Sequence, residues 1–293
     1  MSLRGIAVLF CGILLSALSP AAEPSDANDD FVFLDNGHVK LGVKKSSGAG
    51  IAWLSASGSE RNLINHFDRG RLVQQSYYGK EDGSLWNKQP WRYNPVQGGD
   101  WRGKSAQMLE LKTEKTSLYA KTLPRHWASG KELEETSMEQ RIELQDEVVH
   151  IRYTFKYSGE ETHPEHDQEI PAVFVEPDLN TLVLYDGERS WSGGELHRSQ
   201  PGWPNEGRKI AEHWAAYVDK DDFGLGAYVP VADRLTCYRF GDGNAKQGAC
   251  SYFAPLTKFA IKPGLEWEYD VYLTIGKAAE IRERFSAIAA QKK

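Results

Sequence analysis

The sequence predicts an all-β protein, a large antiparallel β-sandwich followed by a short C-terminal helix. Short runs rich in Val, Ile, Leu, Tyr and Phe alternate with turn residues along most of the chain, as expected of strands joined by tight connections. Only residues 278–290 have the apolar spacing of a helix. No internal repeat or low-complexity linker divides residues 31–293, so we expect a single domain there.

The expected strands follow from side-chain alternation. In the run 147–157, Val149, Ile151 and Tyr153 alternate with polar residues such as Arg152, which predicts a strand with one buried and one solvated face. Gln145 and Asp146, just before this run, predict a hairpin turn. Strands of similar composition are expected at residues 31–35, 38–44, 51–55, 107–112, 117–122, 138–145, 171–176, 181–186, 223–231 and 267–275.

The first 21 residues have the pattern of a secretory signal peptide. Arg4 precedes an uncharged apolar run at residues 5–18, and small residues follow where a signal peptidase would cleave. This run of about 14 residues is short for a membrane span, which needs roughly 20. We therefore expect an exported protein, periplasmic or extracellular, with a polar leader at residues 22–30 and no membrane span in the mature chain.

Charge and motifs exclude several functional classes. The formal net charge is -6, which disfavours general attraction to phosphate backbones, so we expect no nucleic-acid partner. The sequence contains no nucleotide-binding loop, Gly-x-Ser-x-Gly elbow, EF-hand loop or zinc-spaced Cys/His cluster. The absence of these motifs excludes the common kinases, ATPases, serine hydrolases and dehydrogenases as functional classes. We also expect no cofactor and no bound metal. Nothing in the sequence indicates the oligomeric state.

Two cysteines remain after removal of the signal peptide. Cys237 and Cys250 lie in two strand-like runs on either side of a Gly-rich turn, which predicts a hairpin. In an oxidising compartment the two residues are expected to form a disulfide across it. The alternative is a pair of buried thiols.

Residues 62–127 combine polar side chains with many aromatics, as a sugar-binding cleft requires. A sugar presents an apolar face to aromatic rings and a rim of hydroxyl groups to polar side chains. The alternative is that these aromatics fill the core beneath a long loop. The candidate substrate-binding residues of this region are Arg69, Arg71, Gln75, Trp91, Asn94, Gln97, Asp100 and Trp101.

His66 and Tyr77 are candidate catalytic residues within the same region. A strand through residues 71–77 would carry hydrogen-bonding groups on both faces, because Gln75 and Tyr77 would alternate with Gln74 and other polar side chains. Such a strand is costly to bury, so at least one face is expected to line a cleft or a buried polar network. An ordinary loop pinned by an ion pair between Asp68 and Arg71 is the alternative.

A second cluster, at residues 162–177, carries the preferred acid/base pair. His166 and Glu169 lie at the entry to a strand, where a histidine and a carboxylate can exchange protons with a sugar oxygen. Two alternatives remain, a metal site that includes His163 and a solvated charged loop. A third cluster, at residues 194–217, places Trp203 between Gly202 and Pro204 on a loop, where it either faces a ligand or packs.

The segments at residues 35–55, 62–79 and 224–230, with the strand at residues 269–276, resemble the galactose-mutarotase-like superfamily. The resemblance implies a large β-sandwich, the supersandwich, and a secreted bacterial branch of this group. Its members act as aldose epimerases or carry the sandwich within glycoside hydrolases and polysaccharide lyases. The epimerases use a His as acid and a Glu as base, chemistry that His166 or His66 and Glu169 or Glu176 can supply here.

Export favours a glycan over a free cytoplasmic sugar. We therefore expect an exported enzyme that cleaves a polysaccharide or oligosaccharide by acid/base chemistry, as a glycoside hydrolase or a polysaccharide lyase. The alternatives are a non-catalytic carbohydrate-binding protein of the cell envelope and an aldose-epimerase-like enzyme.

Overall fold

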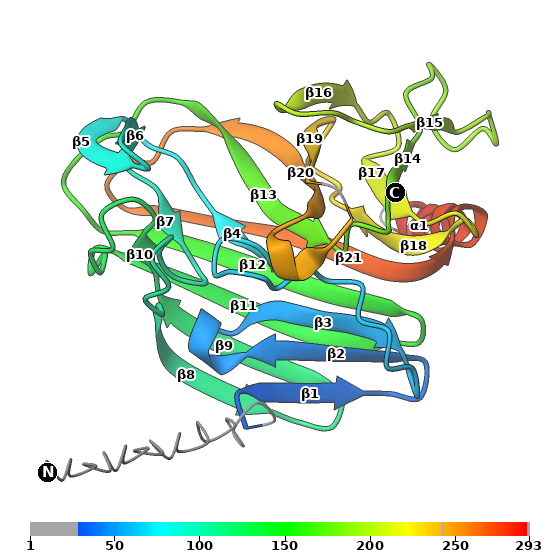
Figure 1. Ribbon diagram of the computed structural model, residues 1–293, viewed down its shortest axis with the longest axis horizontal. Helices are drawn as coiled ribbons and strands as arrows, with labels where there is room; N and C mark the ends of the chain where they lie inside the picture. The colour runs from blue at the N-terminus through cyan, green and yellow to red at the C-terminus, as the bar shows by residue number, and fades with distance from the viewer. Residues whose placement is uncertain (1–28, 242, 292–293) are drawn as a thin grey trace, which may run out of the picture.

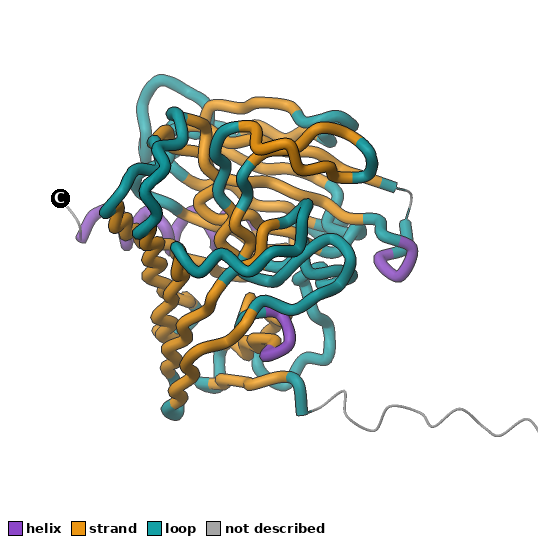
Figure 2. Tube along the Cα trace, turned by 90° about the vertical axis from the view of Figure 1, so that its left-hand side faces the viewer, coloured by secondary structure: helices purple, strands orange, loops and turns teal. Residues whose placement is uncertain are grey.

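The computed structural model describes residues 29–241 and 243–291 and confirms the all-β prediction. A 10-stranded and a 9-stranded antiparallel sheet lie in two layers, and strands dominate the trace (Figures 1 and 2). A third sheet contains two strands. The predicted signal peptide, residues 1–21, and nearly all of the polar leader lie outside the described residues.

The first sheet has the order β1-β2-β3-β4-β13-β20-β19-β16, with β7 attached to β4 and β10 attached to β7. Its strands are β1 (Phe31–Asp35), β2 (Val39–Lys44), β3 (Gly50–Ala56), β4 (Val73–Ser76), β7 (Pro95–Val96), β10 (Arg125–His126), β13 (His166–Val175), β16 (Glu206–Lys209), β19 (Arg234–Phe240) and β20 (Cys250–Phe259).

The second sheet has the order β15-β14-β17-β18-β21-β12-β11-β9-β8. Its strands are β8 (Gln107–Thr113), β9 (Ser117–Leu123), β11 (Thr136–Gln145), β12 (Val148–Tyr157), β14 (Thr181–Leu184), β15 (His197–Ser199), β17 (Trp214–Val218), β18 (Phe223–Tyr228) and β21 (Leu265–Lys277). The third sheet is the hairpin β5 (Glu81–Trp86) and β6 (Gln89–Arg92), and the helices are α1 (Ala278–Gln291) and two short 3₁₀ turns, Lys45–Ser47 and Ala245–Gln247.

The main core lies between the two large sheets, where apolar side chains from both meet. On β12 the predicted alternation holds, because Val149, Ile151 and Tyr153 are fully buried while Arg152 is exposed. The face of the second sheet away from this core carries α1, whose Ile281 and Phe285 are buried in a separate cluster that includes residues of β17 and β18. The predicted C-terminal helix is therefore confirmed.

A buried ion pair fastens α1 to the second sheet. Glu212 is fully buried and accepts hydrogen bonds from Arg282 Nη2 at 2.6 Å and Arg282 Nε at 2.9 Å. The same carboxylate also accepts from Trp214 Nε1 at 3.0 Å and from the backbone N–H of Trp191 at 2.7 Å. The carboxylate is thus fully paired, as burial of a charge requires.

The predicted hairpin around the two cysteines is confirmed as β19 and β20, but the predicted disulfide is wrong. Cys237 and Cys250 are free, buried thiols. The register pairs Cys237 with Phe253 and Cys250 with Phe240, so the cysteines are not opposite each other. They also point to opposite faces, because Cys237 belongs to the main core and Cys250 to a small cluster on the other side of the sheet.

In the described part of the chain, no helix is long and apolar enough to span a membrane.

We expect Arg282→Ala to lower the free energy of unfolding by about 3–5 kcal/mol, because it leaves the buried Glu212 carboxylate without its cation. Arg282→Met, which keeps the apolar stem, should lose a similar amount. Urea unfolding measures both. The control is Lys220→Ala in an ion pair whose side chains are 85% and 71% exposed, where the expected loss is below about 1 kcal/mol. Equal losses for Arg282→Ala and Lys220→Ala would contradict this account.

Candidate functional site

A cavity of about 580 Å³ crosses the outer face of the first sheet. This volume falls within the roughly 300–1,000 Å³ of small-ligand sites. The cavity begins at the β5–β6 hairpin and β7, passes over β4, β13, β20 and β19, and reaches the loop before β16. Its lining residues are Asp68, Gly70, Arg71, Ser76, Tyr78, Trp86, Trp91, Arg92, Asn94, Val96, Trp127, His166, Asp167, Glu169, Phe174, Trp203, Asn205, Tyr238 and Tyr252.

Glu169 is the carboxylate on the floor of this cavity. Its Oε1 accepts hydrogen bonds from the hydroxyl groups of Tyr252, at 2.6 Å, and Tyr78, at 2.9 Å. Burial raises the pKa of Glu169, because desolvation outweighs the stabilisation of the anion by the two tyrosines. A carboxyl group with a raised pKa in a cleft is suited to proton transfer.

An irregularity in β13 aims Glu169 into the cavity. The register of β13 with both neighbouring strands shifts just after Glu169, where Pro171 lies within the strand. In a regular strand, Glu169 and Phe174 would point to opposite faces because their separation is odd. The register shift brings Glu169 and Phe174 to the same face of the sheet, so both side chains line the cavity. Ile170 and Val173 point to the other face and enter the core.

Gln168 positions Tyr78. This fully buried side chain accepts a hydrogen bond from the backbone N–H of Tyr78 at 2.7 Å and donates Nε2–H to the Tyr78 carbonyl at 2.9 Å. A second bond from Nε2 to the Phe259 carbonyl, at 3.2 Å, ties the same amide to β20. The donor to Glu169 is therefore fixed by two neighbouring strands.

His166, the first residue of β13, also lines the cavity. Its Nε2 atom is buried and has no hydrogen-bond partner within the described chain. A buried polar atom without a partner is uncommon in proteins and is available to a ligand. His166 and Glu169 thus both belong to the lining of this cavity, and the first carries a buried, unpaired ring nitrogen while the second carries a carboxylate.

Aromatic side chains form walls at both ends of the cavity. At the hairpin end, Trp86 contacts Trp91 and Trp127 with ring centroids 4.7 and 6.1 Å apart. At the other end, Trp203 contacts Tyr238 with centroids 4.9 Å apart. The polar groups of the floor therefore lie between two aromatic walls, a composition that suits the apolar faces and hydroxyl rim of a sugar.

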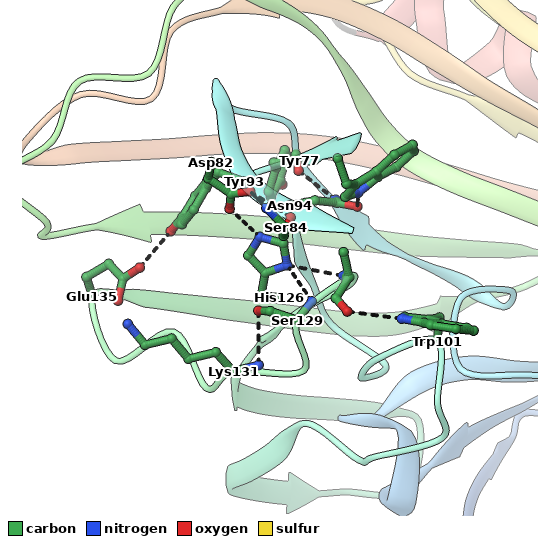
Figure 3. Close-up of polar contacts among 12 residues, drawn as sticks. Tyr77, Asp82, Ser84, Tyr93, Asn94, Trp101, His126, Ser129, Lys131 and Glu135 are labelled. Atoms are coloured by element: carbon green, nitrogen blue, oxygen red, sulfur yellow. Dashed lines mark hydrogen bonds and ion pairs between the residues drawn. The ribbon is translucent and has the colours of Figure 1, made fainter. Parts of the chain in front are cut away.

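A buried histidine anchors the hairpin that carries Trp86 and Trp91 (Figure 3). His126 Nδ1 accepts backbone N–H groups from Ala128 and Ser129 at 3.1 and 3.2 Å, which places the ring proton on Nε2. His126 Nε2 lies 2.6 Å from Oδ2 of Asp82 on β5. Burial alone would raise the pKa of Asp82, but hydrogen bonds from Ser84 and His126 outweigh it and lower that pKa.

Ion pairs at the cavity rim balance its charges. Arg71 Nε lies 3.6 Å from Asp68 Oδ2, and Arg71 also stacks over Phe67 at 5.2 Å from the ring centroid. Arg234 pairs with Asp167 on the far side of Glu169. The charged groups at the rim therefore already have partners of opposite charge.

The structure brings six of the predicted site residues to this cavity: Arg71, Trp91, Asn94, His166, Glu169 and Trp203.

The other predicted site residues lie outside its lining and hold neighbouring segments together. Tyr77 is fully buried and donates its hydroxyl to Gln75 Oε1 at 2.8 Å, and Gln97 donates to Gln140 at 3.0 Å. Asp100 accepts the backbone N–H groups of Arg102 and Lys104 at 3.0 and 2.7 Å.

Three further predicted residues contact backbone carbonyl groups. Arg69 Nε donates to Gly103 at 2.7 Å, Trp101 Nε1 donates to Ala128 at 3.0 Å, and His66 Nδ1 lies 3.2 Å from the Ile64 carbonyl.

Sequence reasoning missed the two phenol donors, Tyr78 and Tyr252. The strand through residues 71–77 does have hydrogen-bonding groups on both faces, as predicted, since Gln75 and Tyr77 form a buried network while Ser76 and Tyr78 line the cavity. Alternation separates Tyr77 from Tyr78, but it does not say which face is inside. Trp86 and Trp127 lie within the predicted aromatic region, residues 62–127. The large number of aromatic residues there was the sequence signal that could have identified both as lining residues.

Comparisons with known proteins identify the fold. No protein-family model and no curated protein matches the chain. Solved structures do match it.

A galactose mutarotase-like protein from Lactobacillus casei matches with a TM-score of 0.57 and 10% identity over 84% of this chain and 100% of the other. A galactose mutarotase related enzyme from Lactobacillus acidophilus matches with a TM-score of 0.54 and 11% identity over 84% and 97%. A galactose mutarotase-like protein from Clostridium acetobutylicum matches with a TM-score of 0.52 and 8% identity over 84% and 95%. The chain therefore has the galactose-mutarotase-like fold, as the sequence resemblance implied.

We expect Asp82→Ala to lower the free energy of unfolding at pH 7 by about 1–3 kcal/mol, because it leaves His126 without its partner. The folded pKa of Asp82 is lowered, so the contribution of its ionised form is present above the unfolded pKa of about 3.9 and is lost as pH falls through the folded value. The difference from wild type, measured by urea unfolding, should therefore shrink below about pH 4. The control is Glu110→Ala, which removes an exposed ion pair with Lys112. A loss of unfolding free energy in Asp82→Ala that does not change with pH would contradict the role of the ionised Asp82.

Proposed function

We propose that the protein is an aldose-epimerase-like enzyme that binds a sugar ring over Glu169 and transfers protons to and from it. The observation that carries this proposal is the buried Glu169 carboxylate, which accepts two phenol hydrogen bonds on the floor of an aromatic-walled cavity. The fold of the galactose mutarotase-like structures supports it as an analogy. We also propose that the enzyme is exported, because residues 1–21 have the pattern of a secretory signal peptide.

Glu169 acts as the base and His166 as the acid in the proposed reaction. The carboxylate removes the proton of the anomeric hydroxyl, the bond between the anomeric carbon and the ring oxygen breaks, and the ring oxygen takes a proton from protonated His166. Rotation of the open-chain aldehyde and ring closure by the reverse transfers then give the other anomer. Both residues end in their starting protonation states.

Cleavage of a glycan is the second candidate. The observation that favours it is the presence of aromatic walls on both sides of Glu169, since a chain held at both ends would place a glycosidic bond near the carboxylate. A non-catalytic binding protein would use the same walls without proton transfer. The epimerase and the cleaving enzyme give different products and the binding protein gives none, so one set of assays separates the three.

We expect Glu169→Gln to lower the rate of anomer interconversion by about 10²–10⁴-fold, because it removes the base while preserving shape. Polarimetry and NMR of freshly dissolved aldoses measure this rate, and reducing-end and unsaturated-uronate assays on polysaccharides run in parallel. Glu139→Gln is the matched control, since Glu139 accepts a hydroxyl from Tyr119 outside the cavity. Wild-type protein that releases reducing ends without accelerating interconversion would replace the epimerase proposal with the cleavage candidate.

Tyr252→Phe should shift the acid limb of the pH–rate profile to higher pH. The variant removes a hydrogen bond to the charged form of Glu169, so the pKa of the carboxyl group, already raised by burial, rises further and the base form is lost at a higher pH. Tyr119→Phe, which removes a hydroxyl–carboxylate contact elsewhere, should leave the profile in place. If Glu169 reacted as the acid instead, the same rise in its pKa would move the alkaline limb and leave the acid limb in place, which would contradict its assignment as the base.

A further inference from the structure

A row of aromatic side chains continues from the strand of Glu169 to the edge of the first sheet. Phe174 on β13 contacts Tyr252 on β20, and Tyr252 contacts Tyr238 on β19, each with ring centroids 4.6 Å apart. Tyr238 in turn contacts Trp203, at 4.9 Å, in the loop before β16. The row therefore runs across β13, β20 and β19 to the loop before β16; Figure 1 shows these strands.

The length of this path exceeds a single sugar ring. Four strand spacings separate β4 from β16, which amounts to about 19 Å at roughly 4.8 Å per spacing. Residues from both ends of the path, including Tyr78 beside β4 and Trp203 before β16, line the same cavity. A monosaccharide that touches Glu169 therefore leaves the far end of the cavity empty.

Trp203 at this far end is both exposed and held in place. The residue is 60% exposed, which is unusual for a large apolar side chain and is typical of binding surfaces when neighbouring aromatics share the exposure. Phe240, itself 45% exposed, contacts Trp203 with centroids 5.4 Å apart.

The loop is fixed on both sides of Trp203. The Gly202 N–H donates to Glu206 Oε1 at 2.8 Å, and Asn205 Nδ2 donates to Thr236 Oγ1 at 3.0 Å. These bonds order the exposed ring before any ligand arrives, which reduces the entropy cost of binding.

We propose that the ligand is an oligosaccharide that lies across the strands, with one sugar residue at Glu169 and a further residue stacked on Trp203. The inference rests on the proposed function, because it takes Glu169 as the reacting group. The apolar face of a sugar ring suits the exposed indole, and the polar floor between the two points suits the hydroxyl groups of the linked residues. Trp203 is then a distal binding residue with no part in proton transfer.

The test is a binding titration on Glu169→Gln, which separates affinity from turnover. Calorimetry with neutral and uronic oligosaccharide series, each from the monosaccharide to the hexasaccharide, measures affinity as a function of chain length. Affinity should rise by about tenfold when the chain becomes long enough to reach Trp203. Adding Trp203→Ala should remove this gain, and Trp203→Phe should restore part of it.

Trp53→Ala is the matched control. Trp53 also packs against an aromatic side chain, Phe33, with centroids 5.9 Å apart, but it lies on β3 outside the cavity lining. Equal affinities for short and long chains, or equal effects of Trp203→Ala and Trp53→Ala, would overturn the inference.

The outcomes also separate this inference from the proposed function. Turnover of free monosaccharides by the wild-type protein without any gain in affinity for longer chains would overturn the inference alone. Binding that depends on chain length and on Trp203, without turnover of any sugar, would support the inference and overturn the proposed function.

Discussion

The site depends on the cost of burying a carboxylate on the face of a sheet. Hydrogen bonds from two tyrosine hydroxyl groups offset part of that cost for Glu169. Tyr78 lies beyond the end of β4, and Tyr252 lies on β20. Both donors are fixed by backbone geometry, since Gln168 clamps the main chain at Tyr78 and the register of β20 against β13 sets the position of Tyr252. The register shift in β13 completes the arrangement, because it turns Glu169 and Phe174 to the same face.

The cavity is built from two kinds of parts. Its floor belongs to strands of the first sheet, which are hydrogen-bonded on both edges and carry Glu169 and Tyr252. Its aromatic walls belong to loops and to the β5–β6 hairpin, which contact the sheet through a few polar anchors such as His126 and Asp82. Loops carried by a rigid scaffold commonly provide binding residues, and this cavity follows that division.

The sequence was most informative where one physical rule decides the outcome. Alternation identified β12, because one face must be apolar, and apolar spacing identified α1, whereas β13 was expected only at residues 171–176 and begins at His166. Register and facing require information from a partner strand, which explains the wrong disulfide and the choice of Tyr77 over Tyr78. The short strands β5, β6 and β7 contain too few alternating apolar residues to be identified from the sequence.

The separate β5–β6 hairpin has an evolutionary consequence. It pairs only with itself, and it carries Trp86 on β5 and Trp91 on β6. Residues in its turn can be exchanged, inserted or deleted without changing the register of any strand that holds Glu169. A lineage with this architecture can therefore change one aromatic wall of the cavity while the strands around Glu169 keep their register.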